Sequence, residues 1–471
     1  MPAYLAIDLG TTGCRSMVFD SALNILGSAY EEYGLVTGDG GLVEQDATLW
    51  WEVTMRTAKK AIAASGPVLV KGISVSSQGI TVVPVDTKLE PLCNAMSWLD
   101  IRAKDETEQL LREEGDRVLF LHTGKHIDAV YTLPKLMWLR NRRPEIFEKA
   151  YKLLMPMDYL IGKLTGRCVT DHSMASGTLM YDLKDSCWSG RILDKYGIPE
   201  EKLPDILWSG ETAGTVLPEV ADELGISRDC TVAVGAQDQK CAAFGAGLEK
   251  GVMTVSLGTA CAVTKLWSEP RPGLFSEVGW CGYVHRNGWV TEGVINTAGA
   301  SLRWLRDLAF KGEGYDVIDR EAGEAVAAGS RVMFFPYLSD PGAGGAFTGI
   351  NLSTDRGCLA AALLEGVAFR IRSLLEKMDA YGSTDSVVLF GGGAKSRLWS
   401  QIIADITGMA VMVPKTEEAA GAGAARLAAL GCGESLPHLG YDRIFRPSDR
   451  KEAYEEKYRA YLGAEALMKK V

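Results

Sequence analysis

Two glycine turns, one in each half of the chain, constrain its fold more than any other feature. The first, DLGTTGCR (Asp8 to Arg15), lies between the apolar runs 3–7 and 16–19, which predict two strands. The second, SLGTACAV (Ser256 to Val263), has the same strand–turn–strand setting. Since strands and helices alternate after each turn, the pair predicts an internal duplication with two α/β lobes. A chance match of the three letters LGT is the alternative.

A change in amino-acid composition marks the division between the predicted lobes. Small residues dominate 235–247, GAQDQKCAAFGAG, and the strand–turn–strand plan restarts after them. We therefore predict a first lobe over residues 1–245 and a second over residues 246–471. Helical spacing of apolar residues predicts helices at 50–65 and 363–378.

Composition excludes several classes of partner. The chain has 471 residues and a formal net charge of −10, with no run of lysine and arginine, so neither nucleic acid nor a membrane surface is an expected partner. The ten cysteines include no C-x-x-C pair, which argues against a zinc site or a disulfide framework. No apolar run approaches the roughly 18 residues of a membrane span, and the start MPAYLAIDLG lacks the layout of a signal peptide. We expect a cytoplasmic protein.

The first glycine turn carries groups that suit a phosphate. Glycine exposes backbone N–H groups, Thr11 and Thr12 add hydroxyl donors, and Arg15 supplies a positive charge. Asp8 offers the oxygen ligands that Mg²⁺ prefers, either directly or through water. A plain hairpin turn that holds no ligand explains the same residues equally well.

A second glycine-rich segment, FGGGAKSR (Phe390 to Arg397), ends a strand-like run and precedes a helix. Such a place brings the backbone close to a ligand and points a helix N-terminus toward negative charge. No Walker loop is present, because the Gly-Lys pairs are followed by His126 and Leu164. The Gly/Ala-rich stretch 416–430 predicts a close-packing helix, and the polar tail from about residue 445 predicts a surface helix without chemistry.

Two further sets of residues suggest the acceptor side of a reaction. Asp238 is a lone carboxylate among small neighbours, where it could act as a general base, although a helix N-cap is the more common role for such an aspartate. In SWLDIRA, strand periodicity would place Trp98, Asp100 and Arg102 on one face, with the ring against a sugar and the polar pair on its hydroxyls. A structural Asp–Arg pair beside a buried tryptophan is the alternative.

Taken in their order along the chain, these motifs resemble the FGGY carbohydrate kinase family, and its xylulose kinase-like branch in particular. The resemblance implies the actin/hexokinase/Hsp70-like ATPase fold, with two duplicated ribonuclease H-like lobes and an interlobe cleft. It also implies a kinase that uses ATP and Mg²⁺ to phosphorylate a small sugar or polyol. The segments that carry it are IDLGTTGCRSMVFD, SWLDIRA, PKLMWL, MPMDYLIGKLTG, GAQDQKCAAFGAG, SLGTACAV, AGASLRWLRD, GGGAKSRLWSQIIADITG and AGAGAARLAAL.

The family's functional positions are carried over by this resemblance alone. Asp238 matches the general base, which overturns the N-cap interpretation, and Asp8 is the candidate Mg²⁺ ligand. The candidate nucleotide-binding residues are Thr11, Thr12 and Arg15 in the first phosphate loop, Gly258 and Thr259 in the second, Gly299 and Arg303 near the phosphates and ribose, and Gly392, Gly393 and Arg397 in the adenosine loop. The candidate substrate-binding residues are Ser77, Gln78, Trp98, Asp100, Arg102 and Gln239.

The resemblance defines the substrate less sharply than it defines the reaction. The Arg-Glu pair that glycerol kinases carry after a glutamine is replaced here by Gly79 and Ile80, and their tyrosine is Val130, so a glycerol clamp is missing. Gln78 stands where xylulose kinases carry histidine, which puts D-xylulose itself in doubt. We expect a ketopentose or a related polyol; a glycerol- or tetritol-type polyol kinase and a non-catalytic actin-like ATP-binding protein are the alternatives. The oligomeric state stays open, with a homodimer as one candidate.

Overall fold

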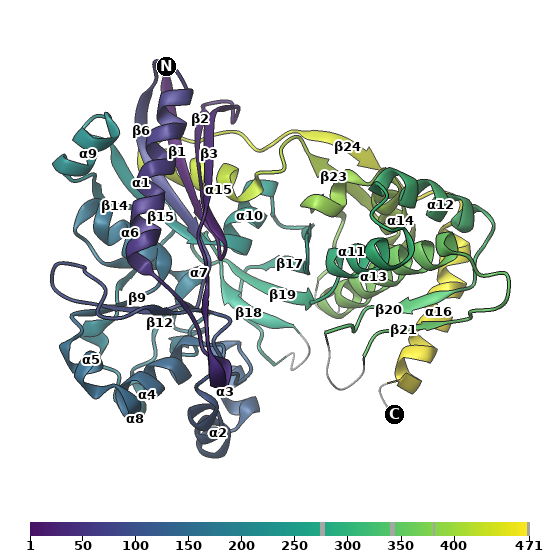
Figure 1. Cartoon of the computed structure of the whole chain (residues 1–471), viewed down its shortest axis with the longest axis horizontal. Coiled ribbons are helices and arrows are strands. Elements are labelled where there is room, and N and C mark those ends of the chain that lie inside the picture. Colours follow the sequence, from purple (N-terminus) through teal and green to yellow (C-terminus); the bar gives the residue numbers. More distant parts are fainter. Residues whose placement is uncertain (274–277, 340–343, 380–381, 469–471) are drawn as a thin grey trace. The chain divides into compact units, whose positions relative to one another are not determined.

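The structure, a computed structural model, describes residues 1–273, 278–339, 344–379 and 382–468 (Figure 1). The chain folds into two compact units. The first unit comprises Met1–Ala246, Trp267–Val290 and Glu418–Leu439, and the second comprises Gly247–Leu266, Thr291–Glu417 and Gly440–Val471. The chain first passes between the units beside the sequence-based boundary at 245/246. Two later segments, Trp267–Val290 and Glu418–Leu439, return to the first unit. The second of them contains a helix that packs on the sheet of that unit.

A six-stranded mixed sheet forms the centre of the first unit. Its strand order is β14-β15-β6-β1-β2-β3, in which β1, β6 and β15 are parallel and β2 is antiparallel to β1. The central strand β1 is buried along almost its whole length, as expected for a strand that is covered on both faces. The strand bounds are β1 (Pro2–Leu9), β2 (Gly13–Asp20), β3 (Ile25–Glu32), β6 (Leu69–Ser77), β14 (Thr212–Thr215) and β15 (Thr231–Gln237).

Helices cover both faces of this sheet. On one face, Val18 of β2 shares a hydrophobic cluster with Trp50 of α1 (Ala47–Ala64), a helix that begins where the Asp46 side chain accepts a hydrogen bond from Thr48 N. On the other face, Met17 of β2 packs against α15 (Ala419–Gly431). Because successive residues of a strand point to opposite faces, these contacts place α1 and α15 on opposite sides of the sheet.

The predicted close packing of α15 is confirmed by its contact with α10 (Asp238–Ala246). A Cβ atom on Gly245 of α10 would lie 1.9 Å from the carbonyl oxygen of Ala419. A Cβ atom on Gly423 of α15 would lie 2.1 Å from the carbonyl oxygen of Cys241. Only hydrogen fits at either position, so α10 and α15 are held at backbone contact.

Smaller elements complete the first unit. They are β4 (Val36–Thr37), β5 (Val43–Gln45), β7 (Val83–Val85), β8 (Ala95–Met96), α2 (Lys104–Glu113), α3 (Asp116–Thr123), α4 (Thr132–Arg142), α5 (Pro144–Lys149), β9 (Lys152–Leu154), α6 (Pro156–Thr165), β10 (Val169–Asp171), α7 (His172–Ala175), β11 (Tyr181–Asp182), β12 (Cys187–Trp188), α8 (Gly190–Tyr196), β13 (Asp205–Leu207), α9 (Pro218–Leu224) and β18 (Gly279–Gly282).

The sheet of the second unit repeats the plan of the first. Six of the seven strands in its sheet follow the order β19-β17-β16-β22-β23-β24, and the seventh, β18, lies at the edge beside β19. Of these six, β16, β22 and β23 are parallel, β17 is antiparallel to β16 and β24 is antiparallel to β23. This matches β3-β2-β1-β6-β15-β14 strand for strand, so the predicted duplication is confirmed. The bounds are β16 (Val252–Leu257), β17 (Cys261–Trp267), β19 (Trp289–Ile295), β22 (Ser386–Phe390), β23 (Ala410–Pro414) and β24 (Tyr441–Phe445).

The predicted surface helix of the C-terminal tail is confirmed, and one face of it is buried. The helix α16 (Lys451–Met468) buries Tyr454, Tyr458 and Tyr461, whose rings lie 5.1 to 6.3 Å from the ring of Phe369. Aromatic residues at helical spacing inside a charged segment were the signal for this buried stripe. The other elements of the second unit are α11 (Gly299–Ala309), α12 (Tyr315–Ala327), β20 (Met333–Phe335), β21 (Ala346–Thr348), α13 (Arg356–Asp379) and α14 (Arg397–Thr407).

The described residues bear on the expectations about disulfides and membrane-spanning helices. All ten cysteines lie among them, and all are free thiols. Across those same residues, the search for a helix with the length and hydropathy of a membrane span finds none.

Candidate active site

Three parallel strands of the first unit end side by side at one edge of the sheet. The strand register pairs Asp8 of β1 with Ser76 of β6, and Gln237 of β15 with Ser77 of β6. Carboxyl ends of parallel strands meet at the same edge, which is where α/β folds bind their ligands. Neighbouring strands lie about 4.8 Å apart, so the ends of β1 and β15 are separated by roughly 10 Å. The edge thus collects Asp8, Gln78 and Asp238 within the span of a small sugar and a phosphate.

Asp238 is the first residue of α10 and follows β15 directly. Its Oδ1 atom accepts hydrogen bonds from the backbone N–H of Gln239, at 2.6 Å, and from the Nε2 atom of Gln237. The backbone N–H of Gln237 in turn donates to Ser173 Oγ at 2.9 Å. A helix N-terminus favours a nearby negative charge, and the side chain of Asp238 stays partly exposed. Asp238 therefore makes cap-like bonds and remains accessible to an acceptor hydroxyl at the same time.

Asp8 lies at the end of β1, where Ser76 Oγ donates to its Oδ1 atom at 2.9 Å. Burial raises the pKa of Asp8 to about 6, against the lowering effect of the Ser76 hydrogen bond. The nearby carboxylate of Glu418 also raises this pKa, whereas Arg15 lowers it. Arg15 itself forms an ion pair with Glu418 at 3.0 Å and lies 5.2 Å from the centre of the Tyr30 ring. The guanidinium group of Arg15 thus already interacts with Glu418 and Tyr30 beside the turn.

The residues present fit a Mg²⁺ ion that is bound largely by a nucleotide. Asp8 offers a single carboxylate in a poorly solvated place, where a cation would stabilise the ionised form. The described residues contain no group of three or more His, Cys, Asp or Glu side chains that could hold a metal on its own. Mg²⁺ commonly takes one or two carboxylates and completes its shell with waters and substrate phosphates, which matches this donor set.

The first glycine turn and the candidate sugar residues form one hydrogen-bond network. Trp98 Nε1 donates to Thr11 Oγ1 at 2.8 Å. Gln45 Nε2 donates to the carbonyl oxygen of Thr11 at 2.7 Å, and Gln78 Nε2 donates to Gln45 Oε1 at 2.8 Å. Thr12 is exposed at the tip of the same turn. The network joins two separately predicted groups, and Gln45, which links them, was missed because nothing in the sequence around it forms a motif.

Two side chains of this edge are almost fully buried. Ser77 Oγ donates to the carbonyl oxygen of Gln78 at 3.0 Å and has no exposed surface. Gln78 is 1% exposed, and its Oε1 atom has no hydrogen-bond partner within the described structure. Buried polar atoms are nearly always paired in folded proteins, so an unpaired acceptor here suits a donor from a ligand.

The SWLDIRA segment is a turn rather than a strand, and the expectation of a shared strand face is wrong. The N–H of Asp100 donates to the carbonyl oxygen of Ser97 at 3.0 Å, which closes the turn. Trp98 is 38% exposed, so its ring can still receive a sugar face.

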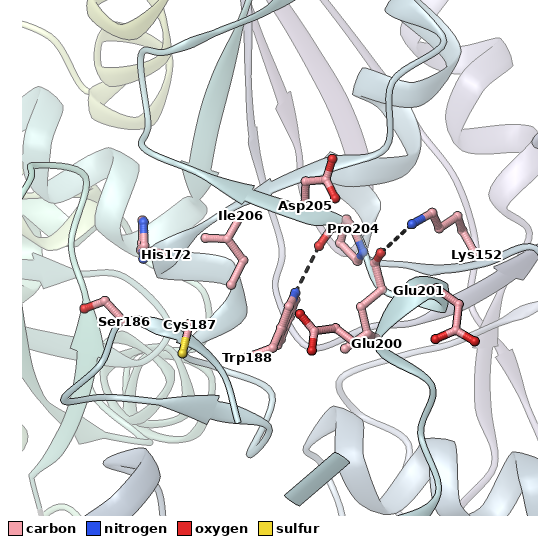
Figure 2. Close-up of a pocket in the computed structure, with 11 residues that line it drawn as sticks. Lys152, His172, Ser186, Cys187, Trp188, Glu200, Glu201, Pro204, Asp205 and Ile206 are labelled. Atoms are coloured by element: carbon pink, nitrogen blue, oxygen red, sulfur yellow. Dashed lines mark hydrogen bonds between the residues drawn. The ribbon is translucent and has the colours of Figure 1, made fainter. Parts of the chain in front are cut away.

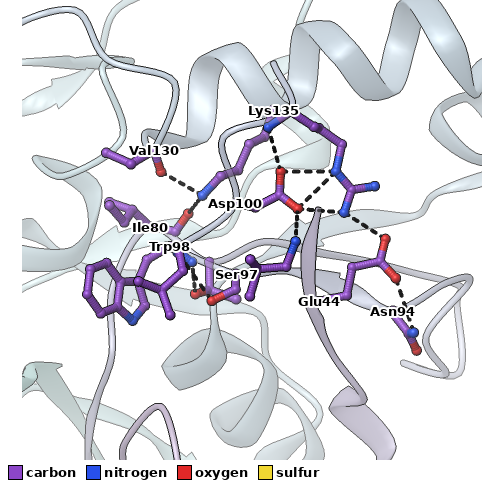
Figure 3. A network of polar contacts seen from close by, with 12 residues as sticks. Glu44, Ile80, Asn94, Ser97, Trp98, Asp100, Val130 and Lys135 are labelled. Atoms are coloured by element: carbon purple, nitrogen blue, oxygen red, sulfur yellow. Dashed lines mark hydrogen bonds and ion pairs between the residues drawn. The ribbon is translucent and has the colours of Figure 1, made fainter. Parts of the chain in front are cut away.

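Asp100 and Arg102 bind chiefly each other and neighbouring protein groups. Asp100 is fully buried and accepts from Arg102 Nη2 at 2.6 Å and from Val43 N at 2.7 Å (Figure 3). Arg102 also donates to Glu44 Oε1 at 2.8 Å and lies 4.9 Å from the centre of the Trp138 ring. These contacts match the alternative of a structural pair and leave Trp98 as the exposed group of the segment.

A cavity of about 690 Å³ in the second unit collects most of the remaining predicted residues. Gly258, Thr259, Gly299, Arg303, Gly392 and Gly393 all line it. Arg397, by contrast, is not among the lining residues and is exposed as the first residue of α14. The other lining residues are Leu257, Leu302, Tyr315, Asp316, Asp319, Lys395, Ser396 and Trp399.

Close backbone contact shapes one wall of this cavity. The N–H of Gly299 donates to the carbonyl oxygen of Gly258 at 2.9 Å, and a Cβ atom on Gly299 would lie 2.4 Å from that same oxygen. Arg303 Nη2 donates to Thr259 Oγ1 at 3.2 Å, which ties α11 to the turn that follows β16. The N–H groups of Gly299 and Ala300 both donate to carbonyl oxygens of this turn, so the groups that suit a phosphate at this wall are the side chains of Thr259 and Arg303.

Sequence reasoning missed the wall that α12 provides. Tyr315, Asp316 and Asp319 lie on α12 and line the cavity, and burial raises the pKa of Asp319. No sequence signal marks these residues, since their spacing is that of an ordinary amphipathic helix. Lys395 and Ser396 belong to the predicted adenosine loop but were not singled out.

A different cavity, of about 560 Å³, lies in the first unit and contains none of the predicted residues (Figure 2). His172 stacks on Trp208 with 3.6 Å between the ring centres, and burial lowers its pKa to about 4. Trp188 Nε1 donates to the carbonyl oxygen of Pro204, and Lys152 Nζ donates to that of Leu203 (Figure 2). These contacts give His172, Trp188 and Lys152 structural roles in the wall of this cavity.

Comparison with known proteins now defines the class of this protein. The model for the N-terminal domain of the FGGY family of carbohydrate kinases matches residues 3–245, and the model for its C-terminal domain matches residues 253–432. The chain belongs to the FGGY family of carbohydrate kinases. It is therefore a phosphotransferase of a family that uses ATP and acts on small molecules, and the predicted fold class is confirmed.

Individual relatives cover nearly the whole length of the chain. A xylulose kinase from Staphylococcus xylosus is 28% identical over 440 residues, which cover 92% of this chain and 91% of that protein. A glycerol kinase from Thermococcus gammatolerans is 31% identical over 489 residues, which cover 98% of this chain and 96% of that protein. The crystal structure of a "xyloylose kinase" from Brucella ovis superposes with a TM-score of 0.90 at 30% identity over 98% of both chains.

Proposed function

We propose that this carbohydrate kinase transfers the γ-phosphate of ATP to a primary hydroxyl of a ketopentose of the xylulose or ribulose type. The observation that carries the proposal is the meeting of Asp8, Gln78 and Asp238 at the ends of three adjacent parallel strands. In the proposal, residues 1–245 form the lobe that binds the sugar and supplies the first phosphate loop. Residues 246–471 form the lobe that supplies the second phosphate loop and the adenosine loop.

Asp238 is the general base in this proposal. Its carboxylate takes the proton from the acceptor hydroxyl as that oxygen attacks the γ-phosphorus; the new P–O bond forms as the bond to ADP breaks. Two hydrogen bonds hold Oδ1, from Gln239 N and from Gln237 Nε2, so the carboxylate is oriented before the substrate arrives. An oriented base within about 3 Å of the hydroxyl contributes typically 10²- to 10⁴-fold to the rate.

Nucleotide binding is assigned to the cavity of the second unit and to the first glycine turn. The side chains of Thr259 and Arg303 support phosphate binding, while Gly392 and Gly393 are assigned to the adenosine side of the cavity that they line. Thr11 and Thr12 supply hydroxyls and N–H groups to the transferring phosphate. Mg²⁺, when bound, would neutralise charge on the phosphates, with Asp8 as its protein ligand. Arg15 is assigned to the same phosphate loop, where it supplies a positive charge beside the turn.

Gln78, Trp98 and Gln239 are the groups assigned to the acceptor. The unpaired Oε1 atom of Gln78 supports a hydrogen bond from a sugar hydroxyl, and the exposed ring of Trp98 supports stacking on the carbon chain. Gln239 is partly exposed beside Asp238. Asp100 and Arg102 then act by fixing the turn that carries Trp98. A glycerol- or tetritol-type polyol is the second candidate substrate, since the glycerol kinase relative is as similar in sequence as the xylulose kinase.

A panel of acceptors tests this proposal. ADP formation is measured with D-xylulose, D-ribulose, L-ketopentoses, tetritols, glycerol and gluconate, and the compounds are compared by kcat/KM. A ketopentose with the highest kcat/KM supports the proposal. Glycerol or a tetritol as the best acceptor selects the second candidate. Failure of every acceptor to raise ADP formation above the background ATPase would favour a non-catalytic ATP-binding protein.

A further inference from the structure

The segment between β6 and β7 contains a strained residue beside the proposed sugar site. Ile80 has a φ of +54°, in the left-handed region that β-branched residues rarely adopt. Such a conformation persists only where the surrounding structure determines it strongly, and it is common at functional sites. Ile80 lies two residues after Gln78, so whatever holds Ile80 also holds the backbone that carries Gln78.

Two donors from α4 hold the carbonyl oxygen of Ile80. Thr132 Oγ1 donates to it at 3.2 Å. Lys135 Nζ donates to it at 3.3 Å (Figure 3). Lys135 Nζ also donates to the carbonyl oxygen of Val130 at 2.6 Å (Figure 3). The two donors are three positions apart on one helix and therefore share a face, which points at the carbonyl.

The burial of Lys135 is complete and costly. Its side chain has no exposed surface, and burial lowers its pKa to about 7, although Asp100 acts to raise it. Arg102 lowers this pKa and Asp128 raises it. Lysine is almost never fully buried unless it is paired, because a desolvated ammonium group is strongly unfavourable. The hydrogen bonds to two backbone carbonyls are the compensating contacts that the structure provides.

The same segment reaches the second candidate sugar residue. The side chain of Thr81 accepts a hydrogen bond from the N–H of Trp98 at 2.9 Å. The carbonyl that Lys135 holds therefore lies between Gln78, on one side along the chain, and the contact to Trp98 on the other. A shift of Ile80 would move both side chains together.

We propose that Lys135 is a positioning residue of the sugar site, which, with Thr132, holds the Ile80 carbonyl and thereby fixes Gln78 and Trp98 for the acceptor. The proposal rests on the assignment of Gln78 and Trp98 to the acceptor and goes beyond it, because Lys135 acts on the substrate only through the backbone of residues 78–81.

The kinetic test compares Lys135→Met with Thr132→Val and with Lys149→Met, the same substitution at an exposed lysine that ends α5. Lys135→Met is expected to raise KM for the best acceptor about tenfold or more, because small misplacements of binding groups are costly, while KM for ATP stays unchanged. Thr132→Val is expected to act in the same direction more weakly, and Lys149→Met to have no effect. A purely structural role would lower the melting temperature and the active fraction and leave the acceptor KM at the wild-type value.

Hydrogen exchange provides a second measurement that does not depend on activity. The peptide that covers residues 78–82 is expected to exchange faster in Lys135→Met and in Thr132→Val, and at the wild-type rate in Lys149→Met. If Lys135→Met fails to fold, Thr132→Val decides the question by the same two measurements. Unchanged exchange in this peptide together with an unchanged acceptor KM overturns the proposal. If the wild type phosphorylates no acceptor, the proposed function fails, and hydrogen exchange alone decides whether Lys135 holds this segment.

Discussion

Substitution of Gly299 by alanine tests the proposal that the cavity of the second unit binds the nucleotide. The added Cβ atom would lie 2.4 Å from the carbonyl oxygen of Gly258, where ordinary van der Waals contact begins at 3.4 Å. One of the two backbone segments must therefore move by about 1 Å, and overpacking of this kind costs about 1–3 kcal/mol. Both segments line the cavity, so much of this cost is expected to fall on nucleotide binding.

The magnitude follows from the affinity scale. Since 1.4 kcal/mol corresponds to a tenfold change, Gly299→Ala should weaken ATP binding by roughly 5- to 150-fold. Isothermal titration with a non-hydrolysable ATP analogue measures the change directly, with the melting temperature as a check on folding. Gly323→Ala, on the neighbouring α12, is the matched control, because its Cβ atom would meet only Leu398 side-chain carbons at 3.9 Å or more. Wild-type ATP affinity in a folded Gly299→Ala protein would refute the assignment of this wall to the nucleotide.

The remaining predictions concern stability in the first unit. Gly245→Ala places a Cβ atom 1.9 Å from the carbonyl oxygen of Ala419, so urea unfolding should show a loss of at least about 2 kcal/mol, and an unchanged midpoint would contradict the described contact of α10 with α15. Burial raises the pKa of Asp158 to about 8, so the folded protein binds a proton there that the unfolded chain releases at much lower pH. Stability is therefore present below the unfolded pKa and is lost as pH rises toward 8, by up to about 1.4 kcal/mol per pH unit. Asp158→Asn should remove this loss between pH 5 and pH 8, and equal pH dependence in both proteins would show that Asp158 is ionised in the fold.

Periodicity and glycine placement made much of the fold predictable. The apolar run before Asp8 and the turn after it predict β1 and β2, and the same pattern at Ser256 predicts β16 and β17. These are local features, because a tight turn between two apolar runs has few structural solutions. The Gly/Ala spacing around Gly423 likewise predicts a helix packed at backbone distance, which the structure confirms.

Features that depend on contacts between distant segments were not predictable in the same way. Gln45 joins Thr11 to Gln78 only because β5 lies beside the turn, and no local pattern marks it. Asp319 lines the cavity of the second unit from a helix whose sequence predicts only an amphipathic surface. SWLDIRA was interpreted with strand periodicity, although the hydrogen bond from Asp100 to Ser97 closes a turn there. In each case the tertiary structure decides which of several allowed local roles is used.

Substitution of Asp238 by asparagine tests the central claim most directly. Asparagine is as good a helix cap as aspartate and can still accept the hydrogen bond from Gln239 N, so the substitution removes the base and keeps the local structure. Asp194→Asn, at an exposed carboxylate of α8, is the control. The measurement pairs a coupled assay of phosphoryl transfer with isothermal titration of ATP. The account predicts a loss of transfer of about 10²-fold or more with ATP affinity near that of the wild type. Transfer close to the wild-type rate in Asp238→Asn would contradict it.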